Sequence, residues 1–294
     1  MSPRIAKNHA QAPIQIVVTP GSGAGRALTI ARRLQEAFCN NGYRVGLGAF
    51  TELGGLSRWA RSRRRGEFSC LVCVGGDTTQ SVAAGAALRL DVPLVSVPSG
   101  FGNMFAGALG LDTAPEAVVD LLEHGQVRRV DVGQAEGDLF LSHRTYGPLQ
   151  QIEEAIEHQR NQLRPRWRRY LAYWLTGIDY LVRKNLPSIR VEVDGVLVSG
   201  DAAMVTIANV ETFRGFLSLT PQAVPTDGLL DVFAMPRMTK RRMWSTLLRL
   251  WLAPRERTEG IMRRRGHAVR VAVNGGPADA VRILPGALQV LSPG

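Results

Sequence analysis

Three glycine-rich turns in the first third of the chain consist of residue types that bind phosphate. They read GSGAG at 21–25, GGD at 75–77 and SGFGN at 99–103. A sharp turn after a strand points several backbone N–H groups to one place, and glycine lets a phosphate come close to them. One such turn is common in α/β proteins, and the first lacks the GK[ST] ending of a P-loop. Three in series, with Asp77 available to hold Mg²⁺ or to orient a phosphoryl group, predict nucleotide binding.

The turns follow short apolar runs that alternate with helical patterns. Helices are expected at 26–40, 53–65 and 78–90, between strands at 14–18, 43–50, 70–74 and 93–97. This alternation predicts a parallel sheet covered by helices, with its ligand beyond the carboxyl ends of the strands. The fold class predicted for residues 1–128 is therefore α/β and Rossmann-like, with the three turns converging on one sheet edge.

Residues 129–294 have the pattern of a second domain, a mainly antiparallel β-sandwich. Its strands are expected at 130–133, 139–142, 189–193, 196–200, 203–208, 229–234, 268–273, 281–284 and 288–291. Packing of the extreme C-terminus back onto the first domain stays open. Two helical segments, 167–184 and 240–252, combine aromatic and leucine residues with arginines. This combination suits an anionic membrane surface, and packing against the β-domain is the alternative interpretation.

The composition indicates a globular protein of about two domains. Hydrophobic residues make up 45% and charged residues 21%, without repeats or low-complexity tracts, which argues against disorder and solenoids. Neither a membrane span nor a secretory signal is recognisable, so we expect a cytoplasmic protein. The three cysteines are too few for a disulfide framework or a zinc site, and Cys70 and Cys73 are predicted to be buried in a strand.

The net charge of +11 indicates an anionic partner: nucleic acid, phospholipid headgroups or nucleotide phosphate. A genome that favours arginine codons is the simpler explanation for the same charge. Because no helix-turn-helix, zinc-finger or RNA-binding aromatic signature is present, a nucleic acid is not expected. A peripheral position at the inner face of the membrane and a homodimer both stay open.

The order of the motifs resembles that of the diacylglycerol kinase catalytic-domain family, whose soluble bacterial lipid kinases are related to NAD kinases and sphingosine kinases. Residues 19–23 (TPGSG) are similar to the family's Asn-Pro-x-Ser-Gly turn, and residues 75–79 (GGDTT) to its Gly-Gly-Asp-Gly-Thr. Residues 98–106 (PSGFGNMFA) are similar to Pro-x-Gly-Thr-Gly-Asn-Asp-Phe-Ala, and the segments 221–231 and 283–293 also fit.

The resemblance implies transfer of the γ-phosphoryl group of ATP, with Mg²⁺, to a lipid hydroxyl, with the lipid entering between the two domains. It implies Asp77 as the catalytic residue. A structural cation site is implied at Asp227 with the backbone at Val224 and Leu229, and a simple Asp-Gly turn is the alternative for Asp227. The implied ATP-binding residues are Ser22, Gly23, Gly75, Gly76, Thr78, Thr79, Ser99, Gly100, Phe101, Gly102 and Asn103.

Several positions in the first half depart from the family pattern. Thr78 stands where the family has a glycine, which permits an unusual backbone and a close phosphate approach. Thr19 replaces an asparagine, and Phe101 replaces a threonine hydroxyl. His143 and Arg144 form a basic pair where members usually have asparagine. These changes affect side chains expected at the nucleotide site.

The most serious departure lies near the C-terminus. The family's Asp-Gly-Glu, whose acids are its general base and the support of that base, reads Asn274-Gly275-Gly276 here. A positioned base typically contributes about 10²- to 10⁴-fold to the rate. Asp279 and Glu211 are candidate substitute carboxylates. The alternative to an active kinase is a pseudokinase of the same fold that binds a nucleotide or a lipid.

Overall fold

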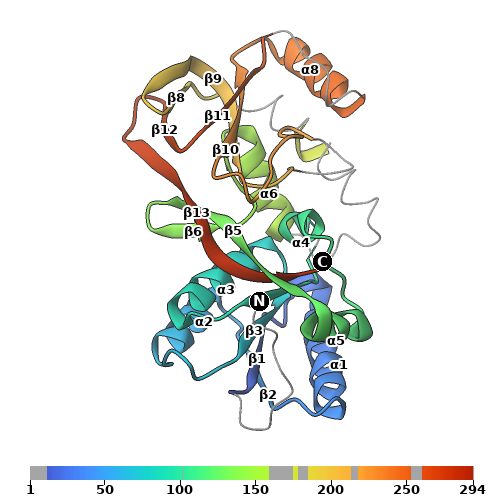
Figure 1. Cartoon of the computed structure of the whole chain (residues 1–294). Coiled ribbons are helices and arrows are strands. Elements are labelled where there is room, and N and C mark those ends of the chain that lie inside the picture. Colours follow the sequence, from blue (N-terminus) through green and yellow to red (C-terminus); the bar gives the residue numbers. More distant parts are fainter. Residues whose placement is uncertain are drawn as a thin grey trace.

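The computed structural model describes residues 12–100, 102–158, 175–177, 185–212, 218–252 and 260–293. Within these ranges one hydrogen-bonded network of 13 strands runs through the molecule, from an α/β part to a β part (Figure 1). Its main path has the order β11-β10-β9-β8-β12-β13-β4-β3-β1-β2. The predicted fold class, an α/β domain followed by an antiparallel β-sandwich, is confirmed.

The α/β part has four parallel strands in the order β4-β3-β1-β2. They are β1 (Ile14–Val18), β2 (Val45–Ala49), β3 (Cys70–Gly75) and β4 (Leu94–Pro98). The helices that follow them in the chain are α1 (Ala27–Asn40), α2 (Leu53–Arg61), α3 (Asp77–Leu90) and, after a short α4 (Met104–Ala108), α5 (Pro115–His124). A 3₁₀ turn, η1 (Ser22–Gly25), lies between β1 and α1.

Alternate residues of the central strands face two different helix layers. Leu71 and Cys73 of β3 belong to one buried cluster with residues of α2 and α3. Cys70 and Val72 belong to another with residues of α1 and α5. Both faces of the sheet are therefore covered, as expected for parallel strands that are apolar throughout. Cys70 and Cys73 are both fully buried, so the prediction that they are small buried side chains is confirmed, and burial raises the pKa of the Cys70 thiol to about 12.

The β part is antiparallel between neighbouring strands. The predicted strands 196–200 and 203–208 form one continuous β9, and 281–284 and 288–291 form one β13 whose register shifts between Leu284 and Leu288. The strands of the β part are β5 (Gln126–Ala135), β6 (Asp138–Phe140), β7 (His143–Tyr146), β8 (Ile189–Val193), β9 (Val196–Ala208), β10 (Leu230–Pro236), β11 (Met262–Gly266), β12 (Ala268–Val273) and β13 (Ala278–Ser292).

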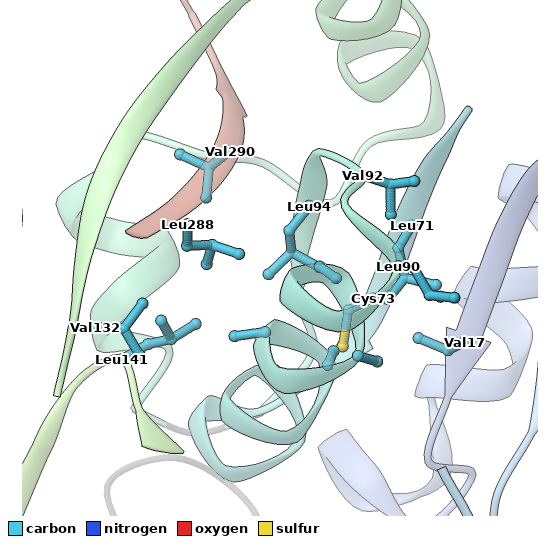
Figure 2. Packing of buried hydrophobic residues seen from close by; sticks show 14 of the residues in the cluster. Val17, Leu71, Cys73, Leu90, Val92, Leu94, Val132, Leu141, Leu288 and Val290 are labelled. Carbon is cyan, nitrogen blue, oxygen red and sulfur yellow. The ribbon is translucent and has the colours of Figure 1, made fainter. Parts of the chain in front are cut away.

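The last strand, β13, joins the two parts. It pairs with β5 along most of its length and places Val290 beside Leu94 of β4 in a parallel register. Figure 2 shows Leu288 and Val290 of β13 packed near Leu94, in the same buried cluster as Leu141. The C-terminal strand therefore contributes to the core of the α/β part.

Two further helices lie on the β part. The helix predicted at 240–252 is α8 (Lys240–Leu252), and α6 (Pro148–His158) follows β7. Met243 and Leu250 of α8 are buried in a cluster with Phe233 of β10. Most of the helix predicted at 167–184 lies outside the described residues. Residues 175–177, the part of this range that the structure describes, are helical. No described helix is both long enough and apolar enough to cross a bilayer.

Candidate functional site

The three glycine-rich turns meet at the carboxyl edge of β1, β3 and β4, so the expected convergence is confirmed. Ser99 Oγ donates a hydrogen bond to Ser22 Oγ at 3.3 Å. Thr79 Oγ1 donates one to Thr19 Oγ1, also at 3.3 Å. Ser22, Ser99 and Thr79 are all buried. The first turn is therefore in direct contact with the other two.

Glycine is needed where these turns touch. A Cβ on Gly23, which has φ +60°, would lie 2.0 Å from the backbone oxygen of Ser99. A Cβ on Gly100 would lie 2.6 Å from the Cα of Gly76. Both clashes are with backbone atoms, which cannot rotate away, so a larger residue would push the turns apart. The result is a cradle of bare backbone at the start of α3, an arrangement of the kind that binds phosphate groups in proteins.

Asp77 is the first residue of α3, and its carboxylate also holds α4. Its Oδ2 accepts a hydrogen bond from the Met104 N–H at 3.2 Å, and its Oδ1 accepts one from the Phe105 N–H at 3.1 Å. Two of the N–H groups that lack partners within a short helix are thereby satisfied from a different segment. Burial raises the pKa of Asp77 above its ordinary value, although these two hydrogen bonds and the charge of His143 act to lower the pKa.

The third turn is held by the side chain of Asn103. Its Oδ1 accepts a hydrogen bond from the Gly100 N–H at 2.8 Å, and its Nδ2 donates one to the Gly100 oxygen at 2.9 Å. Asn103 has φ +46°, a left-handed conformation that asparagine tolerates better than most residues. A Cβ on Gly102 would lie 2.9 Å from Asp77 Oδ2. Phe101, one of the implied ATP-binding residues, lies outside the described residues.

Thr78 stands where the family has a glycine, and its backbone is ordinary helix. It is exposed in the first turn of α3, and it is not among the residues with positive φ. A β-branched residue is therefore accommodated at this position without strain. Its neighbour Thr79 packs against Gly75, where a Cβ would lie 2.4 Å from the Thr79 Cβ.

His143 of the β part pairs with Glu153, and the charge of Asp77 in the α/β part also acts on it. Its Nε2 lies 3.0 Å from Glu153 Oε1, and Thr145 Oγ1 donates a hydrogen bond to Glu153 Oε2 at 2.9 Å. Burial alone would lower the pKa of His143, but the charge and hydrogen bond of Glu153, together with the charge of Asp77, raise it above its ordinary value. Glu153 was not recognised from the sequence, although His143 and Thr145, two residues apart on a strand, must share a face.

Asn274, which replaces the first acid of the family's Asp-Gly-Glu, has a structural role. It lies in the turn between β12 and β13 with φ +52°. Its Oδ1 accepts a hydrogen bond from the Ser188 N–H at 2.9 Å, and its own N–H donates one to the Ser188 oxygen at 2.7 Å. The side chain therefore fixes this turn to the residue that precedes β8.

Of the two substitute carboxylates, Asp279 belongs to a cluster of ionisable groups. Tyr146 donates a hydrogen bond to its Oδ2 at 2.6 Å. A hydrogen bond with the Asp279 carboxyl and the charge of that carboxyl raise the pKa of Glu136. The other candidate, Glu211, accepts a hydrogen bond from Ser218 Oγ at 2.7 Å. The assignment of a base to either carboxylate stays a prediction.

The loop that carries Asp227 is held entirely by the chain itself. Asp227 Oδ1 accepts a hydrogen bond from the Leu229 N–H at 3.0 Å, and Asp227 Oδ2 forms an ion pair with the Arg265 guanidinium. The buried Asp131 accepts hydrogen bonds from the Gly228 N–H and the Gly286 N–H, both at 2.7 Å. In this arrangement the Arg265 guanidinium takes the place beside the Asp227 carboxylate where a cation would bind. The cation role of Asp227, Val224 and Leu229 stays a prediction.

The described members of the implied ATP site other than Thr78 come together with Asp77, whereas the implied cation residues lie on a separate loop of the β part. Ser22, Gly23, Gly75, Gly76, Asp77, Thr79, Ser99, Gly100, Gly102 and Asn103 are linked by the contacts above. The residues missed from the sequence are Glu153 beside His143, and Asp131 and Arg265 beside the 224–229 loop.

Comparison with known proteins identifies both parts of the chain. Residues 13–135 match the family model described as "Diacylglycerol kinase catalytic domain". Residues 152–292 match the model described as "YegS C-terminal NAD kinase beta sandwich-like domain". The two matches follow one another in the chain and correspond to the α/β part and to most of the β part.

Several curated proteins and solved structures are similar over much of their length. A diacylglycerol kinase of Bacillus subtilis is 26% identical over 226 residues, which are 76% of this chain and 73% of that protein. One from Staphylococcus epidermidis is 26% identical over 199 residues, 67% of this chain and 61% of that protein.

A crystal structure of a putative diacylglycerol kinase from Bacillus anthracis has 19% sequence identity and a TM-score of 0.71, and the alignment covers 97% of this chain and 98% of that one. At this identity the likeness shows the shared fold. The two family models show that residues 13–135 belong to the diacylglycerol kinase catalytic-domain family and that residues 152–292 form the YegS-type C-terminal β-sandwich that goes with it.

Proposed function

We propose that the protein transfers the γ-phosphoryl group of ATP, in the presence of Mg²⁺, to the hydroxyl group of a lipid of the diacylglycerol type. The observation that carries the proposal is the meeting of three glycine-rich turns beside a single carboxylate, Asp77. Membership of the family, and the diacylglycerol kinase names of the similar proteins, point to the same reaction class.

The chain's own groups would bind and orient the phosphates. The bare backbone at Gly23, Gly76 and Gly100 allows close approach, and the beginning of α3 favours negative charge. When bound, ATP supplies the phosphoryl group, and Mg²⁺ neutralises charge on its oxygens. Asp77 is fixed by the two N–H groups of α4, and its remaining lone pairs would hold Mg²⁺ or orient the phosphoryl group.

In the transfer itself, the lipid hydroxyl oxygen forms a bond to phosphorus while the bond from phosphorus to the ADP oxygen breaks. The hydroxyl proton passes to a nearby base. Phosphoryl transfer depends mainly on positioning and on neutralising charge. The proposal therefore does not require the acids that Asn274 and Gly276 replace, although their loss lowers the expected rate.

The helix α8 is the surface that we propose for contact with the membrane in which such a lipid resides. One face of α8 is buried on the β part through Met243 and Leu250, while Leu248 and Leu252 are 46% and 69% exposed. Its exposed basic residues are Lys240, Arg241, Arg242 and Arg249. Exposed leucines beside arginines suit the boundary between acyl chains and anionic headgroups.

The decisive experiment measures transfer of labelled γ-phosphate from ATP into a total lipid extract with Mg²⁺, for the native chain and for Asp77→Asn. Asparagine keeps an oxygen that can accept a hydrogen bond from α4 but removes the charge. We expect a labelled lipid with the native chain and loss of the label with the variant. A native chain that is folded and binds ATP but labels no lipid would refute the kinase proposal.

The conformation of Asn274 favours a second candidate, a pseudokinase that binds a nucleotide or a lipid without turnover. An amide that accepts the Ser188 N–H in a turn cannot act as a general base. The labelling experiment separates the two candidates, because a pseudokinase binds ATP and transfers nothing. Bound lipids would then be sought by extracting the purified protein.

A further inference from the structure

Arg265 bridges two carboxylates at the loop where a structural cation is implied. It lies on β11, directly opposite Asp231 of β10 in the antiparallel register. Its Nε lies 3.3 Å from Asp231 Oδ2, and its Nη2 contacts Asp227 Oδ2. The Leu229 N–H occupies the other oxygen of Asp227. The guanidinium thus connects the edge of the β part to the loop that precedes β10.

These contacts provide what a bound cation would provide. The side chain of Asp231 is 11% exposed and that of Asp227 is 29% exposed. Burial raises the pKa of Asp231 to about 6, and a positive partner beside a buried carboxylate offsets part of the cost of burying its charge. A guanidinium is always charged, and its planar set of N–H donors can bind two carboxylates at once.

The far side of the same loop is fixed without a cation as well. Both oxygens of the buried Asp131 accept backbone hydrogen bonds, one from Gly228 and one from Gly286 in the irregular section of β13. The Asp131 N–H donates to the Pro225 oxygen at 2.8 Å. The loop is therefore attached to β5 and β13 on one side and to β10 and β11 on the other, through groups of the protein alone.

We propose that Arg265 takes the structural role of the divalent cation implied at Asp227, so that the 224–229 loop is held by a guanidinium and needs no metal. The proposal does not depend on the kinase function, because it concerns the stability of the β part. It replaces the cation site that the family resemblance implies with an ion pair supplied by this chain.

The test is thermal unfolding of the full chain, without nucleotide, in EDTA and in millimolar Mg²⁺ or Ca²⁺. We expect the native Tm to be the same in all three conditions. Arg265→Met removes the charge while keeping much of the side-chain length. It should lower the Tm by at least about 2–4 °C, the shift expected for roughly 1 kcal/mol in a domain of this size. Divalent cations should restore part of that loss, because Asp227 and Asp231 are then exposed to them.

Arg264→Met is the matched control, since Arg264 is the exposed neighbour on β11 and its side chain alternates to the other face of the strand. Its Tm should match that of the native chain in every condition.

A native Tm that falls in EDTA and returns with Mg²⁺ or Ca²⁺ would overturn the proposal. Calorimetric titration with each metal gives a second measurement, which begins with the native chain and does not depend on the folding of Arg265→Met. Binding that is lost in Asp227→Asn but kept in Asp77→Asn would also overturn it, whereas binding lost only in Asp77→Asn would belong to the proposed nucleotide site. Absence of any binding that depends on Asp227 supports the ion pair.

Discussion

His143 Nε2 lies 3.0 Å from Glu153 Oε1, and this contact joins β7 to α6 within the β part. The imidazole is well buried, with 9% of its side chain exposed, and Asp77 of the α/β part adds a second negative charge nearby. The basic residue noticed in the sequence is therefore held by Glu153 of the β part, and the charge of Asp77 of the α/β part also acts on it.

Replacing Glu153 with glutamine should lower the pKa of His143. Burial opposes the imidazolium, and the Glu153 carboxylate is the main group that offsets burial, so the pKa should fall below its ordinary value of 6.5. Titration of the histidine ring signals by NMR, in the native chain and in the variant, would measure the change. An unchanged His143 titration would contradict the ion pair.

The same substitution predicts how stability depends on pH. A histidine whose folded pKa is raised contributes stability that is fully present below its unfolded value, and this contribution is lost as pH rises through the folded pKa. The native chain should therefore exceed Glu153→Gln in stability by about 1–3 kcal/mol just below pH 6.5. The difference should shrink at higher pH. Urea unfolding at a series of pH values would show this, and a constant difference would contradict it.

Gly100→Ala should abolish nucleotide binding, because its Cβ would lie 2.6 Å from the Cα of Gly76 and would separate the second turn from the third. Gly107→Ala is the matched control. Gly107 lies inside α4, and a Cβ there meets nothing within 4 Å, so alanine should be neutral or stabilising by about 0.5–1 kcal/mol. Binding of a fluorescent ATP analogue measures the first effect, and retained binding by a folded Gly100→Ala would argue against the cradle.

The alternation of strands and helices, with a glycine-rich turn after three of the strands, was sufficient to predict that the turns meet, because the carboxyl ends of parallel strands share one edge of the sheet. What the sequence could not supply are contacts between segments far apart in the chain. Glu153 is separated from His143 by ten residues, and Asp131 from Gly286 by 155. No local pattern distinguishes such acids from exposed ones.

The predicted strand boundaries were wrong where the apolar pattern of the sequence is interrupted although the strand continues. Pro285 and Gly286 end the apolar run at 281–284, which predicts a turn. In the structure they form an irregularity within β13, because Leu288 resumes the pairing with β5. The short α4 was missed because its N-terminus is held by Asp77, 27 residues earlier than Met104, and not by a local capping residue.

Arg242→Ala with Arg249→Ala should weaken binding to vesicles that contain anionic lipid. Each arginine near such a surface contributes about 1 kcal/mol, so the pair should reduce the affinity at least roughly tenfold. Arg32→Ala with Arg33→Ala removes the same charge from two exposed positions of α1. Co-sedimentation with phosphatidylglycerol vesicles compares the two, and an equal loss in both would show that net charge, and not α8, is responsible.

Restoring the missing acids tests why turnover would be slow or absent. Asn274→Asp retains an oxygen that can accept the Ser188 N–H, and aspartate tolerates the φ of +52°. Gly276→Glu places a Cβ 3.1 Å from the Val273 oxygen, a close contact that requires a small shift of the turn. The double variant should keep nearly the native Tm and raise kcat for phosphoryl transfer by about 10²-fold or more, the contribution of a positioned base. Unchanged turnover in a double variant that still binds ATP would mean that the lost acids do not limit the reaction. The next candidates for the base would then be the carboxylates of the cluster of Tyr146, Asp279 and Glu136, on β7, β13 and the β5–β6 turn.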